Sequence, residues 1–294
     1  MSHTIQAAPI EPLPAFAPNR QWWQAVVIAL LVGWLYWAIG IELAKDWWID
    51  PNFSHGFFVP LFSLFLLWQR RSTLAGIAPQ PSAWGILIMI FALCTLVVGV
   101  LGAELFLSRT SLLLLIAGMV VFFLGWNYLR AILFPLAFLV LMVPIPAIIF
   151  NQITFPLQIL ASKVAALVLP VLGVPVLREG NVINLPAMAL EVAEACSGIR
   201  SLLSLTTLAI IYGYLLETRV WVRVLLAVAS LPIAVAANSL RIVCTGLLVQ
   251  YWEPEKAEGF FHLFSGWLIF LVSLVMLFLL HQLLRVRRSP ENQS

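Results

Sequence analysis

The chain has 294 residues, of which 62% are hydrophobic and only 10% are charged, and its net charge is +3. Soluble domains average roughly 45–50% apolar and about 25% charged residues, so this composition excludes a soluble globular enzyme, a disordered tail and a nucleic-acid binder. The three cysteines are an odd number and none forms a Cys-x-x-Cys pair, so neither a disulfide framework nor a cysteine zinc site is expected. We therefore expect a polytopic membrane protein with spans of about 20 residues each.

Residues 1–21 carry four prolines and no long apolar run, which is typical of a disordered cytoplasmic leader rather than a cleavable signal peptide. Residues 22–284 then hold eight apolar runs, several of them flanked by Trp or Tyr as at a membrane interface. We expect about eight transmembrane helices in one all-α domain, followed by a basic cytoplasmic tail over residues 285–294. In chain order the runs are Trp22–Ile41, Phe57–Trp68, Trp84–Leu101, Leu107–Gly125, Ala131–Phe150, Ile199–Leu216, Trp221–Val249 and Phe261–Leu284.

The further apolar stretch Ile153–Val176 is not counted as a span, because it contains Lys163 and three prolines. Proline removes a helical hydrogen bond and a lysine inside the membrane is costly, so an interfacial or re-entrant segment is predicted. With both termini cytoplasmic, nine Lys and Arg residues lie inside and five lie outside, in agreement with the positive-inside rule. The number of crossings must then be even, and eight spans satisfy this only if Ile153–Val176 does not cross.

Two loops are placed on the outer side by this topology. The first is Glu42–His55. The second, Arg178–Glu194, shows partial alternation of apolar and polar residues and a Gly-Asn turn signal, so a small extracytoplasmic hairpin is predicted before the sixth span.

Ionisable residues inside or at the edge of a span are functional candidates, because the membrane core makes each of them costly. Arg241 lies 20 residues beyond Trp221. This separation corresponds to about 30 Å of helix, so Arg241 is expected near the outer end of its span. Asn238 lies three residues earlier, on the same helical face.

Cys196 opens the sixth span from the outer side, in the run Glu194–Arg200. Ser197 is suited to cap the helix that follows. A thiol at a helix N-terminus with a nearby cation is stabilised as the thiolate, and Arg200 supplies that cation one turn further on.

His262 begins the last span from the same side, so Cys196, Arg241 and His262 come from three successive spans and share one face. A thiolate nucleophile, an imidazole acid/base and a guanidinium that holds an oxyanion or a carboxylate form a workable set for acyl transfer. Each residue alone also has a structural interpretation: a small core cysteine, an interfacial histidine, or an arginine that extends to the surface. Cys94 and Cys244 are expected to be such core cysteines.

Four short blocks of the sequence resemble those of the exosortase/archaeosortase family. They are Phe53–Pro60 (FSHGFFVP), Ala195–Arg200 (ACSGIR), Asn238–Arg241 (NSLR) and His262–Gly266 (HLFSG). The blocks occur in the family's order and at family-like spacing, and the resemblance extends from about Trp22 to Leu284.

The resemblance implies a cysteine endopeptidase/transpeptidase of the bacterial inner membrane, with its active site facing the periplasm. Such enzymes process exported proteins that carry a C-terminal Pro-Glu-Pro motif, a membrane helix and a basic tail, together called PEP-CTERM, and they accompany exopolysaccharide production. It also implies that Cys196 is the nucleophile, His262 the proton-transfer residue and Arg241 the third essential group.

In the expected mechanism, Cys196 attacks the peptide carbonyl just outside the substrate's membrane helix and His262 protonates the leaving amine. The thioester then passes to an acceptor, which is a lipid or a polysaccharide-linked group that the sequence does not identify, or to water. Arg200 and Arg178 are candidates to meet the acidic substrate motif, and no metal or organic cofactor is expected. The full set of candidate substrate-binding residues is Arg200, Asn238, Arg178 and His55, the last with a structural role as the alternative.

A different class of protein fits part of the pattern. A non-enzymatic polytopic component of polysaccharide export or transport could use Arg241 and His262 as polar pathway residues. Transporters often show internal repeats and polar groups near the middle of the membrane. Here no repeat is visible and the polar groups gather on one face, which favours the enzyme.

Overall fold

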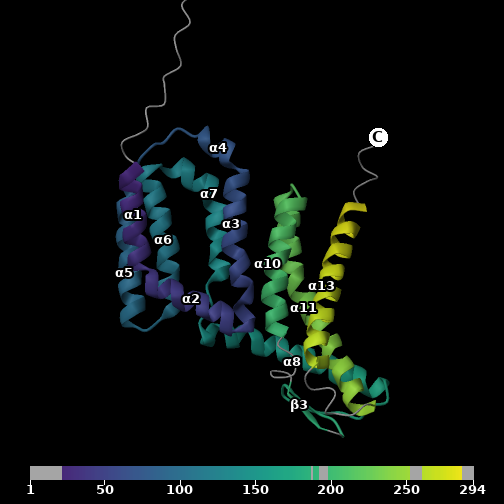
Figure 1. Ribbon diagram of the computed structural model, residues 1–294. Helices are drawn as coiled ribbons and strands as arrows, with labels where there is room; N and C mark the ends of the chain where they lie inside the picture. Colours follow the sequence, from purple (N-terminus) through teal and green to yellow (C-terminus); the bar gives the residue numbers. More distant parts are fainter. Residues whose placement is uncertain (1–21, 187, 192–197, 252–259, 287–294) are drawn as a thin grey trace, which may run out of the picture.

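A computed structural model describes residues 22–186, 188–191, 198–251 and 260–286, and nearly all of these residues lie in helices (Figure 1). The expected leader, residues 1–21, lies outside the described residues, as do Cys196 and residues 287–294 of the expected basic tail. The described part of the chain confirms an all-α polytopic membrane protein with one small sheet.

The first expected span is not one straight helix. It consists of α1 (Trp22–Leu35) and α2 (Trp37–Ile49), which meet at an angle of 61°. The bend falls at Tyr36, whose side chain is buried and whose hydroxyl lies 2.9 Å from the hydroxyl of Ser111 on α6. This long-range hydrogen bond holds the chain against α6 at the bend, a contact that hydropathy does not report.

The third and fourth expected spans form a tight helical pair. They are α5 (Trp84–Leu101), with the expected bounds, and α6 (Leu105–Phe123). The two backbones approach closely at Gly85, where an added methyl group would collide with the backbone of Phe122 and the carbonyl of Gly118. Small residues at such contacts allow membrane helices to pack by close van der Waals contact.

The second expected span has the expected length, whereas the fifth is shorter than the sequence suggests. The second is α3 (Phe58–Gln69), preceded by the 3-10 helix η1 (Pro51–Phe57) and followed by the short α4 (Arg71–Ala75). The fifth was expected over Ala131–Phe150, which is wrong: α7 (Trp126–Phe138) continues only as the 3-10 helix η2 (Leu139–Met142). Pro144 and Pro146 follow, and proline has no N–H to continue a helix.

The next helix, α8 (Ala147–Val171), includes Pro156 and Pro170. In Figure 1 it lies across the lower ends of the upright helices instead of beside them along their length. This direction supports the interfacial interpretation, although α8 is long and apolar enough to cross a membrane by composition. Within the described residues its main helical neighbour is α11.

The predicted hairpin is present and is extended by a third strand, and its outer position stays a prediction. Strands β1 (Leu177–Glu179), β2 (Val182–Asn184) and β3 (Ala189–Glu191) form an antiparallel sheet in chain order. Gly180 has φ of 64° at the first turn, a conformation that glycine adopts without the steric penalty of a side chain.

Three long helices complete the fold and match the last three expected spans within two residues at each end. They are α10 (Gly198–Leu216), α11 (Val220–Tyr251) and α13 (Phe260–Val286). Each of the three packs against the other two. Their shared apolar core includes Leu205 of α10, Leu226 of α11 and Leu277 of α13.

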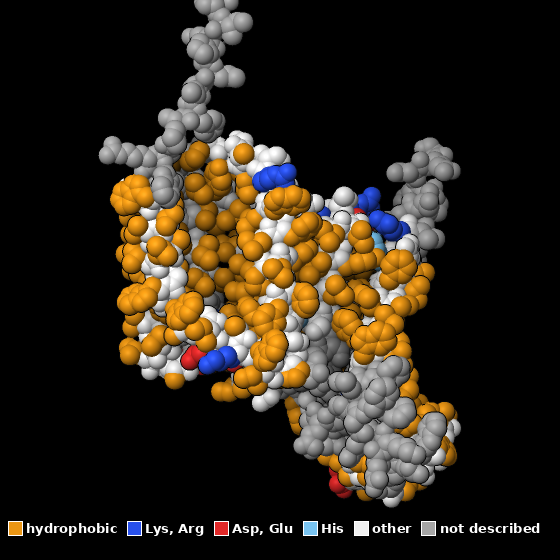
Figure 2. All heavy atoms as spheres, viewed as in Figure 1, with side chains coloured by type: hydrophobic (Ala, Val, Ile, Leu, Met, Phe, Trp, Pro, Cys, Tyr) orange, Lys and Arg blue, Asp and Glu red, His pale blue; other side chains and the backbone are white. Residues whose placement is uncertain are grey.

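Five described helices are long and apolar enough to cross a membrane, or six if α1 and α2 count as one bent span. The eight spans expected from the sequence therefore stay a prediction, because α3, α7 and the apolar part of α10 are short. Figure 2 shows hydrophobic side chains over the sides of the helices and Lys and Arg side chains at the upper end, beside α4 and the end of α13. This surface is typical of a multi-pass membrane protein with one basic side.

A reporter placed in the sheet tests the topology. Fused after Asn184, at the end of β2, it should behave as periplasmic, because the positive-inside rule puts the basic end of the molecule in the cytoplasm. A reporter fused after Thr218, between α10 and α11, should behave as cytoplasmic and serves as the control. A cytoplasmic signal from Asn184 would mean that α8 crosses the membrane.

Candidate functional site

The polar residues of α11 lie at the end of the bundle where α13 begins. Asn238 and Arg241, which were expected on one helical face, are both buried, with exposed fractions of 7% and 4%. Burying an arginine inside an apolar helix costs free energy, so such residues usually contact other polar groups and mark functional sites. The side chain therefore does not simply extend to the surface, which was the structural alternative.

Arg241 reaches across to α13. A methyl group built on Gly266 would lie 3.6 Å from Nη2 of Arg241, so the guanidinium lies directly against this glycine. Gly266 is four residues beyond His262, and positions four apart share one helical face. The structure thus brings Arg241 to the face of α13 that carries His262 one turn earlier; the side chain of His262 lies outside the described part.

The first turns of α10 and α13 give this end of the bundle a positive potential. Both helices run in the same direction, and their N-terminal ends lie at the lower end of the bundle in Figure 1. A helix N-terminus carries about half a positive charge, which favours a thiolate or an oxyanion at this end of the bundle. Cys196 lies outside the described residues, two positions before α10 begins, so its meeting with Arg241 and His262 stays a prediction.

A small cavity lies between α8, α10 and α11 beside the site. Its polar lining consists of Thr154 and Gln158 from α8 and Asn238 from α11, and Leu202 closes it from α10. Its volume is about 20 Å³, which is room for about one water molecule.

The two candidate arginines for the acidic substrate motif have different settings. Arg200 lies in the first turn of α10, and its side chain is outside the described part. Arg178 lies on β1 and donates a hydrogen bond of 2.6 Å to the carbonyl of Gly180. Within the described residues, the Arg178 guanidinium is therefore engaged by the turn of its own hairpin.

His55 lies in a structural contact between two 3-10 helices. It is buried in η1, and its Nε2 lies 3.2 Å from the carbonyl of Leu141 in η2. Burial lowers the pKa of His55 below its ordinary value, so the neutral ring is the donor to this carbonyl. The next residue, Gly56, lies against the Trp47 ring with no room for a side chain, and Trp47 Nε1 donates to the carbonyl of Met142 at 2.8 Å.

The first family-like block, Phe53–Pro60, therefore contains residues that connect η1 to η2 by hydrogen bonding and close packing. Because η1 also packs against α10, these contacts help to position the helix that follows Cys196. This position favours the structural role that was the alternative for His55.

Sequence reasoning missed an ion pair between a buried arginine and a partly exposed aspartate in the N-terminal half. Arg109 of α6 is 3% exposed, and its Nη2 lies 2.6 Å from Oδ2 of Asp46 on α2. The sequence did carry a signal for this ion pair, because an arginine within an apolar run usually pairs with a group of opposite charge. Cys94 and Cys244, expected in the core, are instead exposed on the outer surfaces of their helices.

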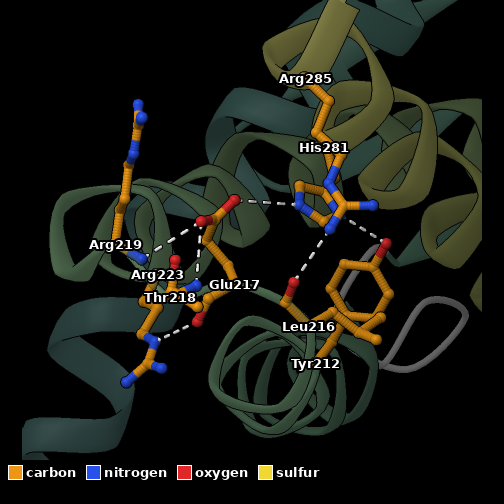
Figure 3. A network of polar contacts seen from close by, with 8 residues as sticks. All are labelled: Tyr212, Leu216, Glu217, Thr218, Arg219, Arg223, His281 and Arg285. Atoms are coloured by element: carbon orange, nitrogen blue, oxygen red, sulfur yellow. Dashed lines mark hydrogen bonds and ion pairs between the residues drawn. The ribbon is translucent and has the colours of Figure 1, made fainter.

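A second polar network, also missed, joins the opposite ends of α10, α11 and α13 (Figure 3). His281 of α13 is 1% exposed; its Nδ1 lies 2.8 Å from the hydroxyl of Tyr212, and its Nε2 lies 3.5 Å from Oε2 of Glu217. Arg285 donates to the carbonyl of Leu216 at 3.1 Å. The network ties the three helices together at the end away from Arg241.

Glu217 is the centre of the network, in the turn between α10 and α11. The backbone N–H of Arg219 donates to its carboxylate, and this hydrogen bond is the main reason that the pKa of Glu217 lies below its ordinary value. Arg223 Nε donates to the Glu217 carbonyl at 2.7 Å. An ionised Glu217 therefore holds the turn at neutral pH.

Among the described residues, no group of three or more His, Cys, Asp and Glu side chains could hold a metal ion. The described part is thus a multi-pass helical membrane protein with a buried arginine at one end of a three-helix bundle.

The sequence matches the family model described as Transmembrane exosortase (Exosortase_EpsH) over residues 47–279. This match covers most of the chain, from the end of α2 into α13, and the chain belongs to the transmembrane exosortase family. Exosortases are membrane-embedded transpeptidases or proteases, so family membership supports a membrane transpeptidase. Comparison with curated proteins and with solved structures gives no match.

Proposed function

We propose that the chain is a cysteine endopeptidase/transpeptidase of the inner membrane that cleaves PEP-CTERM proteins on the periplasmic side, in connection with exopolysaccharide production. The observation that carries the proposal is the position of Arg241, buried in α11 with its guanidinium against Gly266. Family membership adds PEP-CTERM proteins as the implied substrates. The acceptor remains a group of the lipid or polysaccharide-linked class.

The proposed reaction has two acyl-transfer steps. The Cys196 thiolate attacks the carbonyl carbon of the scissile peptide, which forms a carbon–sulfur bond, and the carbon–nitrogen bond then breaks. The leaving amine takes a proton from His262. In the second step an acceptor amine attacks the thioester, its proton passes to His262, and the thiolate is released; water in place of the amine gives a free carboxylate.

Arg241 has the electrostatic role in this scheme. Negative charge develops on the carbonyl oxygen in both steps, and donors that are already in place stabilise it without reorganisation. The buried guanidinium and the backbone amides at the start of α10 are the donors that the proposal assigns. Burial strengthens the interaction because little water screens it.

Mass spectrometry of a substrate tests the proposal. A protein with a PEP-CTERM tail is expressed with the enzyme, and a new C-terminus just before its membrane helix is expected, bearing either the acceptor or a free carboxylate. The matched control is the His262→Ala enzyme, which should leave the precursor at full length. A full-length precursor in the presence of the wild-type enzyme would contradict peptidase activity.

A further inference from the structure

A wide apolar groove runs between α8 and α11, on the outer surface of the C-terminal bundle. Its volume is about 670 Å³. The walls are formed by Leu160, Val164 and Val168 from α8 and by Leu231, Leu240 and Val243 from α11. Several of these side chains are well exposed, including Leu160 at 48% and Leu240 at 46%.

The lining of the groove carries no charged side chain. Its hydroxyl group, on Ser239, already donates to the carbonyl of Val235 within α11 at 2.8 Å. A phosphate-bearing lipid headgroup requires cations or free donors, and neither is present in the lining. The floor includes Ala236 and Ser239, small residues of the kind that let another membrane helix approach closely.

The groove adjoins the small cavity beside the site. Leu157 and Val235 line both of them. The cavity presents the uncharged groups of Thr154, Gln158 and Asn238, and Asn238 is three residues from Arg241. The cavity measures about 20 Å³, which is room for about one water molecule, so the groove and not the cavity accommodates a ligand, and that ligand is apolar.

The length of the groove also fits a helix. The α11 residues that line it extend from Leu231 to Val243, a rise of about 18 Å. This is more than half of the roughly 30 Å hydrocarbon thickness and lies toward the end of α11 that carries Arg241.

We propose that this groove holds the apolar C-terminal helix of the substrate. The proposal rests on the proposed function and adds a binding site to it. The substrate helix enters sideways from the membrane, packs on Ala236 and Ser239, and places the peptide to be cut beside Asn238 and Arg241.

Photo-crosslinking tests the occupant of the groove. A photo-crosslinking amino acid is placed at Leu160 or Leu240, with Leu87 on the lipid-facing side of α5 as the control, since it is similarly exposed. The Cys196→Ala background prevents turnover of the precursor. Adducts that join the precursor's membrane helix to both groove positions, and no such adduct at Leu87, are expected. Adducts with lipid only, or equal yields at all three positions, would overturn the proposal.

A groove-filling variant gives a second measurement. Val164→Trp fills the groove and should raise the substrate concentration for half-maximal rate by about tenfold with little change in the maximal rate. Val97→Trp, at an exposed position of α5, should change neither. Wild-type kinetics from a correctly inserted Val164→Trp enzyme would overturn the groove assignment.

The outcomes separate the two proposals. If the wild-type enzyme cleaves substrate but the groove positions give no adduct, the groove assignment fails alone. If adducts form but no new C-terminus is ever detected, the peptidase function fails and the groove remains a helix-binding site.

Discussion

Replacing Cys196 by alanine is expected to stop processing and leave full-length precursor in the membrane. In the proposed mechanism the substitution removes the sulfur atom that forms the thioester, so the remaining residues have no covalent intermediate to stabilise. Loss of one small side chain should leave insertion and yield nearly normal. The measurement is conversion of precursor to product in membranes, normalised to the amount of enzyme.

The two other cysteines provide the matched controls. Cys94 on α5 and Cys244 on α11 are both free and exposed. Cys94→Ala and Cys244→Ala should therefore process substrate at the wild-type rate, because neither side chain supports the core. Equal loss of activity in all three variants would indicate a packing effect and would remove Cys196 from the role of nucleophile.

For Arg241, lysine is the most informative substitution. The side chain is buried against Gly266, and a lysine ammonium cannot reproduce the planar set of donors that a guanidinium offers. Loss of one such contact in acyl transfer lowers the rate by about a hundredfold to a thousandfold. We therefore expect Arg241→Lys to be produced and inserted normally and to be almost inactive in the precursor conversion assay.

Arg219, in the turn between α10 and α11, is the control for charge alone. Its side chain is exposed at the end of the bundle away from Arg241, so Arg219→Lys should keep its activity. Near-normal conversion by Arg241→Lys would exclude the guanidinium from the active site and leave Cys196 and His262 to account for the chemistry.

Hydropathy predicted the long helices well and the broken ones poorly. The expected runs for α5, α10, α11 and α13 agree with the structure within two residues, because an uninterrupted apolar run has no competing local signal. The sequence did not predict the bend in the first run or the early end of the fifth, because these depend on a tertiary contact and on prolines. The anchored side chain of Tyr36 bends the chain between α1 and α2, and the prolines after Met142 end the fifth helix early.

The candidate site was predictable in part, because chain order and loop charges place residues on a face but not beside one another. Arg241 and Asn238 were identified from the cost of polar groups in membranes, and both are buried where α11 meets the start of α13. Arg178 and His55 were grouped with them by motif or charge alone. In the structure they bond to the backbone carbonyls of Gly180 and Leu141, and the sequence alone does not predict these partners.

The ion pair between Asp46 and Arg109 has a consequence for the biosynthesis of the protein. A ribosome completes α2 before α6, so the acidic partner has already reached the membrane when the arginine emerges. Insertion scales give a cost of about 2.5–3.5 kcal/mol for an arginine at the centre of a span, and the cost falls toward the end of the helix, where Arg109 lies. With Asp46 already in place, we expect the cation to meet its counter-ion while α6 is integrated, before α10, α11 and α13 are synthesised.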